Sequence, residues 1–128
     1  MPINLELIEN GHILHFQVDG GWTPEEIVAS KEKVRRIFQE ARHTVHALVD
    51  LRKARVSVPL LMASQQVIGG EPLPNSGQIA VVGVSWIMRS LAEPILRLAG
   101  GADTVLFFNT IDEATAYLRR FIKQETPR

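Results

Sequence analysis

The sequence contains no cysteine, and this absence removes several kinds of chemistry. A chain without thiols forms no disulfide bond, has no cysteine nucleophile and supplies no thiolate ligand to a metal ion. We therefore expect the fold to be indifferent to the redox state of its compartment.

The sequence also lacks an excess of charge of either sign. Its 14 lysines and arginines balance 14 aspartates and glutamates. Domains that bind nucleic acid usually carry a basic surface, so this balance predicts no nucleic-acid partner. Residues 1–11 lack the basic and apolar segments of a signal peptide, and no run approaches the ~18 apolar residues of a membrane span. We therefore expect no membrane span and a cytoplasmic location.

Hydrophobic residues make up 45% of the 128 residues, enough for the core of one domain covering residues 1–128. The most informative stretch begins with an apolar run at 79–84, typical of a central strand that is covered on both faces. Ser85 follows and can cap a helix, with Arg89 on its solvated side. Spacings of three and four residues put four side chains on the inward side of this helix: Ile87, Leu91, Ile95 and Leu98.

The flanking segments complete an alternation of strands and helices. Residues 3–8 and 14–18 alternate around a turn at Gly11 and predict a β-hairpin. Thr23, Pro24 and Glu26 predict a capped helix start. The further predicted elements are a strand at Val45–Leu51, a helix at Val56–Ile68, a loop at Gly69–Gly77, a strand at Thr104–Phe108 and a helix after Thr110. The order β-β-α-β-α-β-α-β-α predicts an α/β fold with a mixed sheet.

Three of these segments also resemble a known family. They are Val49-Asp50-Leu51 with the helix after it, Val81-Val82-Gly83 leading into Ser85, and Phe107-Phe108 followed by Asp112-Glu113-Ala114. Together they resemble a STAS or SpoIIAA-like domain over nearly the whole chain. The resemblance implies a mixed β-sheet with an N-terminal hairpin and right-handed β-α crossovers. It also implies a role such as anti-sigma factor antagonist, regulatory module, or relative of lipid-binding domains.

The chain departs from this family at one functional position. In the antagonists, an Asp-Ser pair precedes a helix and its serine is the phosphoacceptor, whereas the matching positions here are Val58 and Pro59. Ser57 lies close by, at a predicted helix start where a phosphate would be favoured. A helix-start serine is more often a simple cap. We therefore predict a STAS-type domain without the usual phosphoacceptor serine.

No set of residues predicts a metal, a cofactor or a catalytic group. His12 and His15 differ by an odd number, so in a strand they would point to opposite faces. His43 and His46 could approach one ligand, but no third metal ligand is evident. Ser85 lacks the glycine two residues later that a nucleophile elbow requires. We predict that the protein is not an enzyme.

The remaining candidate is a surface at the carboxyl-end rim of the sheet, where open α/β folds usually bind ligands. Three arginines there could meet an anionic group: Arg52, Arg55 and Arg89. The predicted ligand or partner surface contains Ser57, Met62, Leu73, Ser85, Trp86, Met88 and Arg89. The same aromatic and methionine side chains could instead pack as ordinary core beneath the 69–77 loop.

We predict a regulatory or protein-interaction module with a protein partner, and the sequence leaves a homodimer open. The alternative is a carrier or sensor of a small apolar ligand or lipid, with a pocket at the carboxyl ends of the strands. An exposed apolar surface around Trp86 would favour the first function, and an enclosed apolar pocket there would favour the second.

Overall fold

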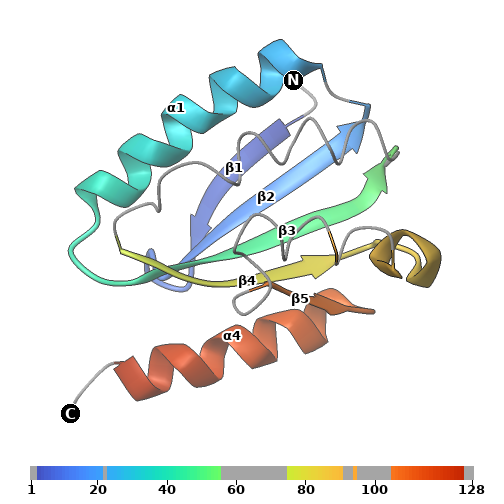
Figure 1. Cartoon of the computed structure of the whole chain (residues 1–128). Coiled ribbons are helices and arrows are strands. Elements are labelled where there is room, and N and C mark those ends of the chain that lie inside the picture. Colours follow the sequence, from blue (N-terminus) through green and yellow to red (C-terminus); the bar gives the residue numbers. More distant parts are fainter. Residues whose placement is uncertain (1–2, 22, 56–74, 91–93, 95–104, 126–128) are drawn as a thin grey trace.

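The chain folds around one five-stranded sheet with strand order β1-β2-β3-β4-β5 (Figure 1). The computed structural model describes residues 3–21, 23–55, 75–90, 94 and 105–125. Its elements are β1 (Ile3–Ile8), β2 (Ile13–Gly20), α1 (Pro24–Glu40), β3 (Val45–Ala54), β4 (Ser76–Val82), β5 (Val105–Phe108) and α4 (Ile111–Glu125). A further helical segment covers 86–90. The helix predicted at 56–68 lies outside the described residues.

The first two strands form the predicted hairpin. β1 pairs antiparallel with β2, from Ile3 opposite Val18 to Ile8 opposite Ile13. Three successive residues in the turn, Glu9, Asn10 and Gly11, have positive φ angles of 53°, 57° and 83°. Glycine adopts this left-handed conformation readily and asparagine tolerates it, which explains why the chain reverses here.

The other strand pairs are all parallel, so the sheet is mixed and the predicted α/β class is confirmed. Three predicted bounds of β3 and β4 were wrong. β4 ends at Val82 and not at residue 84, because Gly83 turns the chain out of the strand. β3 continues to Ala54, because its end stays paired with β2 as far as Gly20. β4 begins at Ser76, inside the predicted 69–77 loop, because Ser76 pairs with Val45 at the start of β3.

Asn75 directly precedes β4 and links it to the end of α1. Its side-chain amide donates to the carbonyl oxygens of Phe38 at 3.0 Å and Ala41 at 2.9 Å, at the end of α1. Its own backbone has φ 61°. Carbonyls at a helix end have no partner within the helix, so this side chain satisfies two of them and ties α1 to β4.

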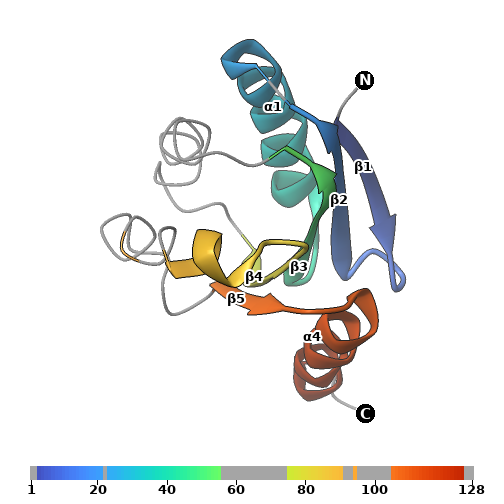
Figure 2. The ribbon, with the colours of Figure 1, turned by 90° about the vertical axis from the view of Figure 1, so that its right-hand side faces the viewer.

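The two long helices cover opposite faces of the sheet, as Figures 1 and 2 show for α1 and α4. Successive residues of a strand point to opposite faces, and β2 shows this with two completely buried neighbours, Ile13 and Leu14. One core cluster lies under α1 and contains Leu14, Val34, Phe38 and Val45. A second lies under α4 and contains Ile13, Leu48, Ala80, Val82, Ala114 and Leu118.

The predicted starts of α1 and α4 are confirmed. Thr23 and Glu26 form a complete capping box at the start of α1. The hydroxyl of Thr110 accepts a hydrogen bond from the backbone N–H of Glu113 at 3.1 Å, at the start of α4. No helix in the described parts of the chain is long and apolar enough to cross a membrane.

Gly83 brings the end of β4 against the backbone of β3. Its φ is 94°, a conformation that other residues adopt only with strain. A Cβ at this position would collide with the backbone of Arg52 and Leu51. Two separate constraints, conformation and space, therefore require glycine where the chain leaves β4.

We predict that Gly83→Ala lowers the free energy of unfolding by about 2 kcal/mol or more, because it adds both backbone strain and a backbone clash. Urea denaturation of both proteins measures the difference. Gly21→Ala is the control, because no described atom outside its chain neighbours lies within 4 Å of the Cβ it would add. Equal losses in the two variants would contradict this explanation.

Candidate functional site

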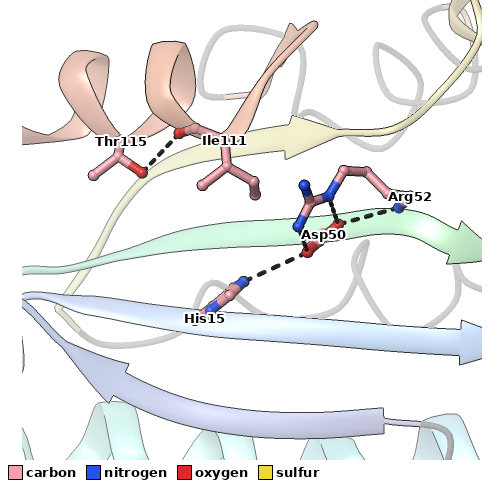
Figure 3. Close-up of polar contacts among 5 residues, drawn as sticks. All are labelled: His15, Asp50, Arg52, Ile111 and Thr115. Atoms are coloured by element: carbon pink, nitrogen blue, oxygen red, sulfur yellow. Dashed lines mark hydrogen bonds and ion pairs between the residues drawn. The ribbon is translucent and has the colours of Figure 1, made fainter.

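The carboxyl ends of β3 and β4 carry the polar and apolar groups that sequence reasoning placed at the rim. On the β3 side, Asp50 and Arg52 point to the same face of the sheet and form a two-point ion pair (Figure 3). Arg52 donates from Nε to Oδ1 and from Nη2 to Oδ2 of Asp50, each at 2.9 Å. The backbone N–H of Arg52 also donates to Oδ1 at 3.1 Å.

The Asp50 side chain is only 8% exposed, whereas that of Arg52 is 55% exposed. Burial disfavours the charged carboxylate, but the hydrogen bonds and charge of Arg52 outweigh it, and the pKa of Asp50 lies below its ordinary value. Asp50 is therefore held ionised in the sheet, and Arg52 covers it from the solvent side.

His15 lies beside this pair on the neighbouring strand β2. Its Nε2 is 3.9 Å from Oδ2 of Asp50, too far for a hydrogen bond, and its ring points toward the carboxylate in Figure 3. This nitrogen is buried and has no hydrogen-bond partner among the residues that the structure describes. Figure 3 also shows Thr115 of α4, which donates its hydroxyl to the carbonyl of Ile111 in its own helix.

A hollow of about 100 Å³ opens at the ends of β2 and β3. It lies where the strand register shifts between Gln17 and Asp19. Its lining residues are Gln17, Val18, Asp19, Asp50, Arg52 and Lys53. Because two acidic and two basic side chains line it, the hollow suits water or a small polar group and does not offer an apolar ligand a dry surface.

The apolar part of the rim begins after Gly83. Ser85 caps the helical segment as predicted, since its hydroxyl accepts from the backbone N–H of Met88 at 3.3 Å. Trp86 and Ile87 follow, and they are 75% and 55% exposed. Two large apolar side chains thus stand in solvent, side by side in the sequence.

Arg89 holds this segment against the end of β5. Its Nε donates to the carbonyl of Val84 at 3.2 Å, and its Nη2 donates to Oδ1 of Asn109 at 2.9 Å. The guanidinium carbon also lies 5.8 Å from the centre of the Phe107 ring. These contacts restrict the position from which Trp86 and Ile87 project.

The predicted sides of this helical segment were wrong. Ile87 was expected to face the core and is exposed, whereas Arg89 was expected in solvent and is half-buried. Trp86 and Met88 were candidates either for one ligand or partner surface or for ordinary core, and the structure separates them. Trp86 is exposed, whereas Met88 packs against the cluster of Val18, Leu51, Val81, Val84 and Val105. Val84 and Met88 are one helical turn apart, so the inward side runs through these two residues.

Several predicted residues cannot be compared with the structure. Ser57, Met62 and Leu73 lie outside the described residues, and so do residues 69–74 of the predicted loop. Arg52 was one of three arginines that could meet an anionic group, but two nitrogens of its guanidinium already bind Asp50. Arg55 is exposed, and its backbone N–H donates to the carbonyl of Gly20.

The four histidines do not gather at one ligand site. His12 stacks on His43, with ring centres 4.0 Å apart. His46 is 1% exposed and its Nδ1 accepts from the backbone N–H of Gln78, so this nitrogen is not free to bind a ligand. Among the residues that the structure describes, no three histidine, aspartate or glutamate side chains could hold a metal ion.

Sequence reasoning missed the group made by Asp50, Arg52 and His15. Its signal is visible in retrospect. Asp50 interrupts an apolar strand, and Arg52 follows two residues later, so both side chains share one face if the strand continues. The predicted strand stopped at Leu51, which left Arg52 outside it.

The comparisons with known proteins concern the fold. A crystal structure of an uncharacterized protein from the DUF3478 family, from Shewanella loihica PV-4, has a SpoIIAA-like fold and matches this chain with a TM-score of 0.66. The match covers 91% of each chain at 15% sequence identity. No family model and no curated protein matches the sequence. The SpoIIAA-like fold expected from the sequence is therefore confirmed, and this chain has the fold of a STAS-type domain.

We predict that Asp50→Asn destabilises the protein at pH 7 by about 1–3 kcal/mol. The substitution removes the buried carboxylate that Arg52 binds, so the ion pair between the two side chains is lost. Since the folded-state pKa of Asp50 is lowered, its contribution is fully present above the unfolded-state pKa of about 3.9. The contribution is lost as the pH falls through the folded-state pKa.

The free energy of unfolding, measured from pH 7 down to pH 2, tests this prediction. The Asn variant should approach the wild type in stability at the acid end. Asp19→Asn, an exposed neighbour in the same hollow, is the control. A constant difference between Asp50→Asn and the wild type across the whole pH range would rule out the ion pair as the cause.

Proposed function

We propose that this STAS-type domain is a non-enzymatic module that binds a protein partner through the rim after β4. The observation that carries the proposal is the exposure of Trp86 and Ile87, at 75% and 55%. Tryptophan supplies much of the binding energy where proteins meet, and large apolar side chains projecting together into solvent favour such a surface.

The surroundings of these side chains support a binding role. Ser85 caps the segment, Arg89 ties it to Asn109, and Met88 anchors it in the core. A surface held in place before binding loses less conformational entropy when the partner arrives. Trp86 and Ile87 can therefore act as preorganised apolar anchors.

The titratable groups nearby support a function without catalysis. Asp50 is engaged by Arg52, and the Nε2 of His15 is buried beside it. Neither group projects into the hollow as a free acid or base that could reach a substrate. The domain would also act without the usual phosphoacceptor serine, because Val58 and Pro59 occupy the matching positions.

The alternative, a carrier of a small apolar ligand, gains no support from the hollow at the ends of β2 and β3, because charged side chains line it. Native mass spectrometry of the purified protein separates the two functions. Bare protein agrees with the interaction module. Extra mass that is released on denaturation would make the carrier the better account and would overturn the proposal.

We predict that Trp86→Ala weakens partner binding by about 30-fold or more, the loss typical of a central aromatic anchor, while the fold is retained. Proteins captured from a cell extract by immobilised wild type identify the partner, and titration of that purified partner gives the affinities. Leu106→Ala is the matched control, because Leu106 is an exposed apolar residue on β5. The proposal fails if both variants bind the partner as tightly as the wild type.

A further inference from the structure

β1 is an edge strand whose outer side has no described partner. It pairs only with β2 in the described sheet, and no described helix or strand lies beyond it in Figure 2. An edge strand presents unpaired backbone N–H and C=O groups, which can pair with a strand of another chain. This edge also carries Leu7, which is 48% exposed.

The strand lacks the usual features that prevent edge pairing. Proteins protect edges with proline, lysine, bulges or very short strands. β1 has six residues, INLELI, with no proline and no basic residue, and its register with β2 is unbroken from Ile3 to Ile8. Its single charged residue is Glu6. The strand is thus long and regular enough to accept another strand, and Glu6 restricts which register is allowed.

The alternation of β1 provides a self-complementary register. Ile3, Leu5 and Leu7 lie opposite Val18, Phe16 and Leu14 of β2, on the face that α1 covers. Asn4 and Glu6 lie opposite Gln17 and His15, on the other face. If a second copy of β1 pairs antiparallel with the first, the α1-covered faces of both sheets must lie on the same side of the joined sheet. This requires odd-numbered residues of one β1 to oppose odd-numbered residues of the other, because a shift by one residue exchanges the faces.

We propose that β1 pairs antiparallel with β1 of a second copy, with Leu5 opposite Leu5 on the two-fold axis. This register puts Ile3 opposite Leu7 on the α1 face, so both exposed Leu7 side chains gain an apolar neighbour. On the other face, Asn4 lies opposite Glu6 and can donate to its carboxylate. The result is one continuous ten-stranded sheet with an isologous interface.

The neighbouring registers are less favourable. Centring the axis on Glu6 puts the two carboxylates of that residue opposite each other, and like charges in directly opposed positions destabilise a sheet. Centring it on Asn4 pairs Ile3 with Leu5 and leaves Leu7 opposite the start of the chain. Centring it on Leu7 leaves only Glu6, Leu7 and Ile8 paired within β1. The register centred on Leu5 pairs residues 3–7 of both copies, covers both Leu7 side chains and avoids opposing like charges. This inference does not depend on the partner proposed for Trp86.

Charge substitutions at Asn4 and Glu6 test both the dimer and its register. Both side chains are exposed, so the changes should leave the monomer fold intact. Sedimentation equilibrium gives the dimer dissociation constant over a range of protein concentrations. Asn4→Glu would place a carboxylate opposite Glu6 twice per dimer, and we expect the dissociation constant to rise by about fivefold to tenfold.

The double variant N4E/E6K then puts opposite charges in both of these pairs, and it should restore or tighten the dimer. Ala116→Glu is the control, because it adds the same charge at an exposed position on α4 and should have no effect. A protein that remains monomeric at all concentrations would overturn the proposal. So would a dimer that responds equally to N4E and N4E/E6K, because its interface would not use this register.

Discussion

The close approach of Gly83 to the backbone of Arg52 is the constraint on which the rim of this sheet depends. β3 and β4 run parallel and are paired up to Asp50 and Val82. Immediately beyond that pair, a Cβ at residue 83 would meet the backbone of β3. With φ at 94°, Gly83 turns the chain out of the strand at this point and starts the helical segment over the core. The glycine thus sets the direction in which the chain leaves β4 toward Ser85 and Trp86.

Two different surfaces lie on the two sides of the contact between Gly83 and the Arg52 backbone. On the β3 side, Arg52 covers the buried carboxylate of Asp50 and leaves a polar hollow beside β2. On the β4 side, Met88 points into the core and Trp86 points out. The polar side is internally neutralised by its own ion pair, whereas the apolar side has no described partner that covers it. This difference is why a binding function is proposed for Trp86 and Ile87.

The sequence predicted those features that local chemistry decides. The hairpin turn at Gly11, the capping box at Thr23 and the cap at Ser85 all depend on residues within a few positions. The α/β class followed from the pattern of apolar runs and turns, and the resemblance of three segments to a known family implied the SpoIIAA-like fold. These features need no knowledge of distant contacts.

The sequence did not predict features that depend on distant partners. β3 extends past Leu51 because Arg55 and Gly20 continue the pairing, and β4 starts early because Asn75 caps α1, more than thirty residues away in sequence. The inward side of the helical segment was misassigned, because it depends on Val84 entering the core before the helix begins. The Asp50–Arg52 pair was missed for the same reason as the strand end. Residue spacing within one segment cannot reveal such contacts.

The environment of Trp86 is the most direct test of the central claim, which is that the rim after β4 presents an exposed apolar surface. The chain has two tryptophans, so Trp22→Phe leaves Trp86 as the only indole reporter. Its fluorescence should resemble that of tryptophan in water, and acrylamide should quench it efficiently. Blue-shifted emission that resists quenching would show that Trp86 is buried in the core, and this result would contradict the account.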